Sequence, residues 1–278
     1  MKKLLFVFSA LALVLGSCSK SDSTAPVVDS TSVTLPGDVL ISKIIESYVA
    51  GVVANTTTFT YNGKKILKFE DTNGLKVSFT YSGDNITKKE TYNNNVLSNT
   101  EDFAYDTSNR VLKYTQTIAG STPTIENYIY DSTDPTTIQL NNLVSGTTYN
   151  FGSSFEGTIT VANNQATEIS YRYDLSSSSS LYIRKKNSYI FDGKNSFYKN
   201  ITGFKNIAFA GVRNLNTGYD NNIKQQVKFY NNTQTALTTT ATTNWLYVYN
   251  TNDFPASCTK TAISTSGNTT TSNITYVY

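Results

Sequence analysis

The sequence predicts an all-β protein, an antiparallel up-and-down meander of about 12–16 strands that forms a curled sheet or a barrel. The first reason is composition. The chain has 20 Tyr and 14 Phe among many Thr, Ser and Asn residues, and aromatics with Thr favour strands whereas Asn favours turns. The second reason is a hairpin motif that recurs along the chain. Consecutive hairpins with short loops make antiparallel neighbours, because parallel strands need long crossovers.

The N-terminal segment predicts export and lipid attachment. A positive start, Lys2-Lys3, precedes the apolar run Leu4–Leu15, which is shorter than the roughly 20 residues that span a bilayer core. The run closes with Leu-Gly-Ser-Cys, ending at Cys18. This arrangement resembles the lipobox of bacterial lipoproteins, in which the cysteine becomes the lipid-modified first residue. The resemblance implies a signal peptide over residues 1–17 and lipidation at Cys18.

The rest of the chain is expected to form a tether and one domain. Residues 18–36 hold the lipidated cysteine, many Ser and Thr residues and few apolar ones, which is typical of a flexible spacer. Residues 37–278 are expected to form a single β-meander domain.

The repeated motif is an aromatic residue, one spacer, a tyrosine and a turn-forming residue, followed by an aliphatic residue. In a strand, the aromatic and the tyrosine two places later point to the same face. The Asn-Gly and Ser-Gly pairs after the tyrosine tolerate the positive φ of tight turns. Each repeat therefore predicts a strand, a turn and a return strand. The tyrosines are Tyr61, Tyr81, Tyr105 and Tyr130, and the aliphatics are Ile66, Ile86, Val111 and Ile138.

One segment, Asn200–Gly211, departs from strand alternation. Its apolar residues fall at positions 201, 204, 207 and 208, which is helical spacing, and Gly211 is placed to end a helix. We expect one short helix near 203–210 that packs an apolar face onto the sheet or into one mouth of it. Its expected role is a core plug, and the alternative is a ligand gate.

Two resemblances to known families extend this interpretation. The segment Tyr105–Val111 is similar to the YD repeat of Rhs-type proteins, and the match is to a hairpin chemistry. The lipobox, the Ser/Asp tether, the Phe-Thr-Tyr hairpins and Lys199–Phe204 together resemble uncharacterised exported lipoproteins of Bacteroidota type over nearly the whole chain. That resemblance implies a porin-like β-meander at the cell envelope, without an assigned activity.

Composition excludes several kinds of function. Loss of the signal peptide removes two lysines and lowers the formal charge from +3 to +1, so nothing favours nucleic-acid binding. The chain has no His, which removes Ser-His-Asp and Cys-His catalysis and His-ligated zinc. If Cys18 carries lipid, Cys258 has no disulfide partner in the chain, and we expect it to be a small buried residue. We therefore expect no cofactor and no enzymatic activity.

The chemistry that composition leaves open uses carboxylates, either as an acid/base pair or as calcium ligands. Glu126, Glu156 and Glu168 lie in or near predicted strands and could form such a pair, or could be strand-surface carboxylates that face lysines. Asp-rich turns could supply calcium ligands, but Asx residues at hairpin turns need no ion, and we interpret them as turns. They begin at Asp71, Asp131 and Asp192.

Aromatic residues near the C-terminus are the candidates for ligand contact. Trp245, the only tryptophan, could stack a sugar ring, together with Tyr247 and Tyr249. The alternative is that these rings belong to the core or its rim. The final strand, Ile274–Tyr278, resembles the closing strand of outer-membrane barrels.

We expect a lipid-anchored, non-enzymatic β protein of the outer membrane, on its periplasmic or its cell-surface face, that acts as a binding or scaffolding surface. Its membrane contact would be the lipid on Cys18, and its ligand a glycan, a lipid or an envelope protein. Three alternatives stay open: an envelope carbohydrate-active enzyme with paired carboxylates, a lipid carrier with an apolar cavity beneath the 200–211 helix, and an integral outer-membrane barrel.

Overall fold

The computed structural model describes residues 39–48, 52–142, 155–163, 165–175, 178–211, 219–230 and 236–278. They all belong to one of the two units into which the chain divides, Thr34–Tyr278. The predicted signal peptide, Cys18 and the tether lie outside the described residues, so lipidation at Cys18 stays a prediction. No helix in the described ranges is long and apolar enough to cross a bilayer.

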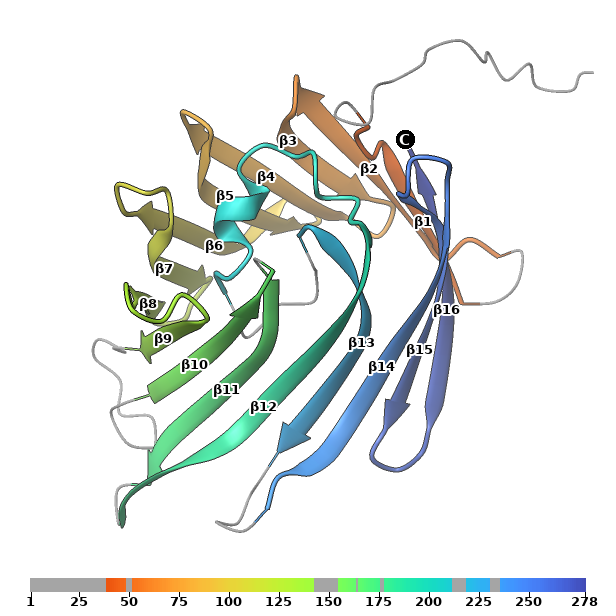
Figure 1. Ribbon diagram of the computed structural model, residues 1–278. Coiled ribbons are helices and arrows are strands. Elements are labelled where there is room, and N and C mark those ends of the chain that lie inside the picture. The colour runs from red at the N-terminus through yellow and green to blue at the C-terminus, as the bar shows by residue number, and fades with distance from the viewer. Residues whose placement is uncertain are drawn as a thin grey trace, which may run out of the picture. The chain divides into compact units, whose positions relative to one another are not determined.

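The described ranges contain sixteen antiparallel strands that follow one another around a closed barrel (Figure 1). Each strand pairs with its neighbours in sequence, and β1 pairs with β16 to close the ring. The predicted meander is confirmed, and of the two predicted arrangements the sheet adopts the barrel. The strands are β1 (Lys43–Ser47), β2 (Asn55–Asn62), β3 (Lys65–Asp71), β4 (Leu75–Ser82), β5 (Asn85–Asn93), β6 (Val96–Tyr105), β7 (Val111–Ile118), β8 (Thr124–Tyr130), β9 (Thr137–Asn142), β10 (Phe155–Ala162), β11 (Gln165–Leu175), β12 (Ser178–Asn195), β13 (Asn221–Tyr230), β14 (Thr238–Tyr249), β15 (Pro255–Ser264) and β16 (Thr269–Val277).

Three of the four repeated hairpins have a β-bulge at the repeat tyrosine, and Tyr130 pairs with Ile138 without one. The pairing register shifts between Thr80 and Tyr81, where Tyr81 faces Ile86, and the same shift occurs at Tyr61 and Tyr105. A bulge adds one residue to one strand and interrupts the ladder of backbone hydrogen bonds. The motif in the sequence therefore encodes a bent hairpin end as well as a turn.

The repeat tyrosines also join neighbouring hairpins. The hydroxyl of Tyr130 donates to the carbonyl of Val111 at 3.0 Å, and the hydroxyl of Tyr105 donates to the carbonyl of Ile86. Tyr105 and Tyr130 thus bond the backbone beside the bulge of the preceding repeat. Burial raises the pKa of Tyr81 and Tyr130 to about 12, so these hydroxyls stay protonated and can donate at neutral pH.

The hydrophobic core lies inside the barrel, at the end where residues 196–211 pack against it. The repeat aliphatics there are almost completely buried, with Ile66 and Ile86 at 0% exposure and Val111 at 1%. Aromatic rings line the neighbouring inner wall: the ring centroid of Phe69 lies 5.5 Å from that of Phe59 and 5.9 Å from that of Phe79. Apolar side chains therefore point inward on β2–β7, as the alternation in sequence predicted.

The single helix of the described residues, α1 (Phe204–Ile207), is shorter than the segment predicted at 203–210. The chain turns instead of continuing the helix, because Gly211 docks on the barrel wall. Its N–H group donates to the Tyr128 hydroxyl at 3.0 Å, and a Cβ atom at this glycine would lie 3.1 Å from the Tyr114 ring. This close approach fixes the end of the segment more strongly than helical propensity does.

The segment 196–211 packs into one end of the barrel (Figure 1). The ring of Phe204 stacks on Tyr198, with centroids 4.8 Å apart, and packs against Phe79 at 5.7 Å. The hydroxyl of Tyr81 donates to the carbonyl of Thr202 at 3.2 Å. These contacts agree with the predicted core plug, and we call residues 196–211 the plug.

The outer face of β3–β6 is polar and charged. Phe69 and Phe103 point inward, so the neighbouring Lys68, Glu70 and Asp102 point outward. The Nζ atom of Lys68 lies 2.9 Å from Oε2 of Glu70, and these side chains are 41% and 47% exposed. Lys88 and Asp102 face each other in the same way, with 42% and 48% exposure. These charged pairs are therefore exposed on the outside of this part of the barrel.

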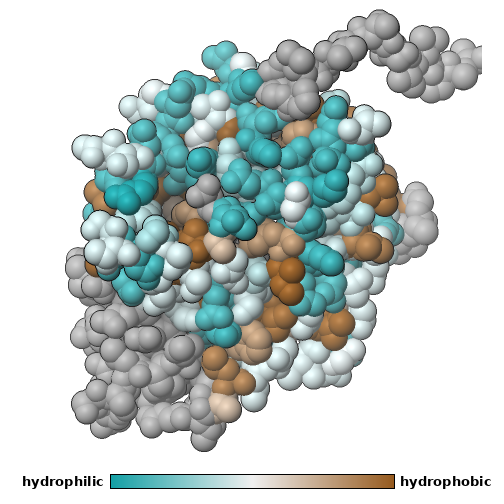
Figure 2. Space-filling model, viewed as in Figure 1, coloured by the Kyte–Doolittle hydropathy of each residue, from teal (hydrophilic) through white to brown (hydrophobic). Residues whose placement is uncertain are grey.

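The outer face of β12–β16 is rich in hydroxyl groups and carries a few exposed apolar residues. Figure 2 shows hydrophilic residues over the upper part of this view and single hydrophobic residues among residues of intermediate hydropathy below. Ile190, Leu246 and Val248 are 54%, 74% and 60% exposed.

Candidate functional site

The three aromatics predicted to face a ligand lie on β14 and belong to its inner face. Trp245 and Tyr247 alternate with the exposed, outward Leu246 and Val248 and pack against the core cluster. The ring centroids of Tyr247 and Tyr249 lie 5.9 Å apart. Sequence reasoning therefore selected the inner face of this strand, and contact with a ligand stays a prediction.

Two polar side chains extend this aromatic face across the sheet. Lys260 on β15 pairs in register with Trp245, and Ser272 on β16 pairs with Lys260. Because Cys258 is buried inside the barrel, Lys260 two residues later points inward as well. Directly opposed Cβ atoms lie about 4.5–5.5 Å apart. The indole, the ammonium and the hydroxyl thus form one row across three strands.

On the other side of Trp245, the row continues on β13. Gln226 pairs in register with Thr243, which is two residues from Trp245 on the same face. The Gln226 amide donates to the hydroxyl of Tyr189 at 3.4 Å, and both side chains are buried. We call Gln226, Thr243, Trp245, Lys260 and Ser272 the Trp245 row.

The exposure of inward side chains differs from place to place along the barrel wall. At the plug end, Ile66 and Ile86 are fully buried. Farther along the inner wall, Lys89 is 29% exposed, and Lys228 is exposed near the far end of β13. Part of the inner wall is therefore exposed. Within the Trp245 row, Gln226 and Ser272 are 4% and 5% exposed, and Thr243, Trp245 and Lys260 are half-buried.

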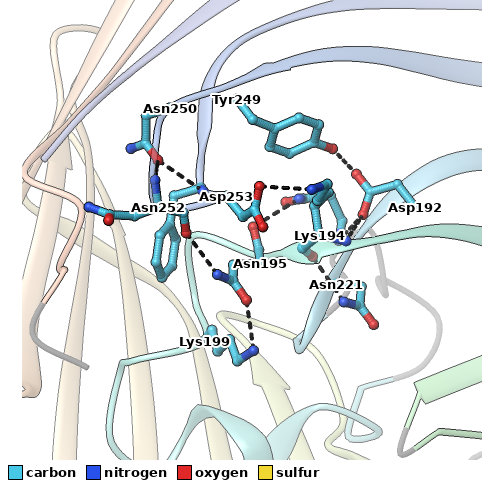
Figure 3. A network of polar contacts seen from close by, with 11 residues as sticks. Asp192, Lys194, Asn195, Lys199, Asn221, Tyr249, Asn250, Asn252 and Asp253 are labelled. Atoms are coloured by element: carbon cyan, nitrogen blue, oxygen red, sulfur yellow. Dashed lines mark hydrogen bonds and ion pairs between the residues drawn. The ribbon is translucent and has the colours of Figure 1, made fainter. Parts of the chain in front are cut away.

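A polar network holds the hairpin ends beside this row (Figure 3). The hydroxyl of Tyr249 donates to the carboxylate of Asp192, and Nζ of Lys194 lies 2.8 Å from Oδ1 of Asp253. The side-chain amide of Asn195 donates to the backbone carbonyl of Asn252 at 3.0 Å. The end of β12 is thereby fixed to the β14–β15 turn and to Tyr249, the third predicted aromatic.

Burial changes the acidity of two groups near Tyr247. It raises the pKa of Asp192 above its usual range, although the backbone N–H of Lys194 and groups of Asn222 donate to this carboxylate. It also raises the pKa of the Cys258 thiol to about 12. Cys258 is 2% exposed and forms no disulfide, which confirms the expectation of a small buried residue. The thiolate is absent at neutral pH.

The structure does not bring the predicted glutamates together as an acid/base pair. Glu126 on β8 is buried inside the barrel and accepts from the Tyr128 hydroxyl at 2.6 Å. Glu168 on β11 lies on the outer face, where its Oε2 is 2.8 Å from Nζ of Lys186. The side chain of Glu156 lies outside the described residues. Pairing of Glu126 with Glu168 is therefore wrong, because Glu126 points into the barrel and Glu168 lies on its outer face.

Sequence reasoning missed a buried carboxylate on β6. Glu101 is 6% exposed, accepts from the Tyr114 hydroxyl at 2.7 Å and forms an ion pair with Lys89. Its position two residues before inward Phe103 is the signal that could have found it. With its charge paired inside the wall, Glu101 serves to hold β5, β6 and β7 together.

The predicted Asp turns are confirmed as turns. Oδ1 of Asp71 accepts from the backbone N–H of Asn73 at 3.0 Å, and Oδ1 of Asp131 accepts from that of Thr133 at 2.7 Å. Asp192 binds Lys194 N–H in the same way. In the part of the chain that the structure describes, no three His, Cys, Asp or Glu side chains are grouped to hold a metal ion.

Comparison with known proteins gives structural matches only. No family model and no curated protein matches the chain. A porin-like protein from Bacteroides uniformis matches with a TM-score of 0.43 and 12% identity, over 85% of this chain and 96% of that one. A porin-like protein from Bacteroides vulgatus matches with a TM-score of 0.37 and 14% identity, over 86% of this chain and 99% of that one. The sequence resemblance also implied a porin-like meander, whereas the lipoprotein family and the YD repeat have no match.

Proposed function

We propose that this protein is a lipid-anchored, non-enzymatic binding barrel of the bacterial outer membrane, in which acylated Cys18 holds a barrel that itself stays in water. The polarity of the wall carries the proposal. On β3–β6 apolar rings point inward, and the charged pairs Lys68–Glu70 and Lys88–Asp102 point outward. The pair Lys89–Glu101 is the exception and points inward. A barrel embedded in lipid has the opposite arrangement, with an apolar outer band, and each Lys at mid-membrane depth costs about 2–4 kcal/mol there.

The interior supports binding at one end and closure at the other. The plug fills the barrel with Phe204, Ile201 and Tyr198, where a lipid carrier would need room for acyl chains. On the inner wall, Trp245 and Lys260 of the Trp245 row are half-buried, so solvent reaches part of each side chain. A ligand of moderate polarity would therefore enter from the end opposite the plug.

Membrane fractionation of the full-length chain tests the anchor and the water-exposed barrel together. Wild-type protein should require detergent for release from membranes, whereas Cys18→Ala should be released by aqueous buffer alone. Cys258→Ala is the matched control, because it removes the other cysteine and should still require detergent. Mass spectrometry of the wild-type protein should find acyl chains on an N-terminal Cys18.

Two outcomes of this fractionation contradict the proposal. If Cys18→Ala still needs detergent, the strands are embedded and the protein is an integral barrel. If wild-type protein is released by buffer alone and carries no lipid, there is no anchor. In both cases the fold stands and the proposed function falls.

A further inference from the structure

We propose that the Trp245 row binds an acidic oligosaccharide, built from uronic acid units, inside the barrel; this inference rests on the binding function proposed above and names its ligand class. The row lies on three adjacent strand pairs, β13–β14, β14–β15 and β15–β16. Trp245, Thr243 and Lys260 are half-buried and present an indole face, one hydroxyl and one ammonium group, whereas Gln226 and Ser272 are buried. All five side chains belong to regular strands, which hold their positions more firmly than loops do.

Lys260 is the group that selects an anion. Inside the barrel Lys89 is paired with Glu101, and on the outer face Lys68, Lys88 and Lys186 are paired with carboxylates. Lys260 has no ion pair within the described residues. A half-buried ammonium without a carboxylate partner gains from an anionic ligand, because hydrogen bonds to charged groups contribute more than neutral ones.

Trp245 beside Lys260 favours a sugar that carries a carboxylate. The indole offers a broad apolar face for the C–H surface of a pyranose ring, with little conformational entropy to lose. The half-buried hydroxyl of Thr243 can donate to or accept from ring hydroxyls. An acyl chain fits poorly, because it would remove water from the Lys260 ammonium without replacing its hydrogen bonds. A multiply charged phosphate also fits poorly, since the row has a single cation and no Arg.

The only tryptophan of the chain reports directly on this site. We suggest titrating the purified full-length protein with galacturonic acid oligomers and following Trp245 fluorescence, beside neutral galactose oligomers of the same length. The acidic oligomers should give a saturable change in fluorescence. The neutral oligomers should bind with an affinity at least about tenfold lower. Binding of the acidic oligomers should weaken as salt is added.

Two charge-removing variants sharpen the experiment. Lys260→Gln should lower the affinity for the acidic oligomer by about tenfold or more, and so remove the preference for it over the neutral one. Lys113→Gln is the matched control, because Lys113 is an exposed, outward lysine on β7 without a partner in the described residues, and it should bind like the wild type. Circular dichroism should confirm that both variants are folded, and Lys260→Met provides a second variant if Lys260→Gln is not.

Three results would overturn the inference: equal binding of acidic and neutral oligomers, unchanged binding by folded Lys260 variants, or no binding of either oligomer. None of these results changes the fractionation of Cys18→Ala. A wrong ligand class and a wrong anchoring model are thereby distinguished.

Discussion

The hydroxyl that joins one hairpin to the next gives the sharpest test of how this barrel is stabilised. Tyr130→Phe removes only the oxygen that donates to the Val111 carbonyl at 3.0 Å. The phenyl ring remains to pack beneath Arg110, whose guanidinium carbon lies 4.3 Å from the ring centroid. The carbonyl belongs to a residue with 1% exposure, and a buried acceptor left without its donor costs about 1–3 kcal/mol.

Urea unfolding followed by Trp245 fluorescence measures this cost. At about 2–4 °C per kcal/mol for a domain of this size, Tyr130→Phe should also lower Tm by roughly 2–12 °C. The control is Tyr92→Phe on the outer face, where the hydroxyl meets Glu90 at 3.4 Å; it should change stability by less than about 0.5 kcal/mol. Equal losses for the two variants, at unchanged m-value, would refute the idea that the repeat tyrosine stabilises the bulge of its neighbour.

Three further predictions concern a glycine of the plug, the buried Cys258 and Asp192 of the polar network. Gly203→Ala should destabilise more than Gly120→Ala, because both glycines have positive φ but only at Gly203 would the new Cβ atom meet a backbone atom, the Asp84 oxygen at 2.6 Å; thermal unfolding compares them. Cys258 should react with a thiol reagent at mildly alkaline pH only after denaturation, because its pKa is raised to about 12, and fast labelling of folded protein would contradict this. Since burial raises the pKa of Asp192 in the folded state, that state binds the proton more tightly than the unfolded chain does. This carboxyl therefore adds stability as pH falls from the raised pKa toward the usual value of 3.8, and denaturant titrations at stepped pH should show that Asp192→Asn lacks this gain.

The fold was largely predictable because its signals are local. A tyrosine, a turn residue and an aliphatic lie within about ten residues of one another, and the bulge, the turn and the inward face all follow from that short pattern. Alternation also predicted that the repeat aromatic and the tyrosine two places later, such as Phe79 and Tyr81, share one face of the sheet. Closure was not predictable in this way, because pairing of β1 with β16 depends on curvature summed over all the hairpins rather than on either strand alone.

The candidate site was predictable only in part, for a related reason. Trp245 and Tyr247 could be assigned to one face of a strand from alternation alone. Lys260 could not be placed beside Trp245, because the register of β14 and β15 shifts by one residue between Val248 and Tyr249, and such a shift leaves little trace in sequence. The length of α1 was misjudged because docking of Gly211 on the wall overrides the helical spacing of the segment.

The seam between the first and last strands constrains how the molecule can assemble. All other strand pairs join consecutive segments, whereas the bond from Ser42 Oγ to the Val277 carbonyl spans 235 positions. During synthesis β1 emerges early and must leave one edge unpaired until residues 273–277 are available. An exposed edge can recruit strands from other chains, so the interval before the seam forms is when this protein is most vulnerable to aggregation.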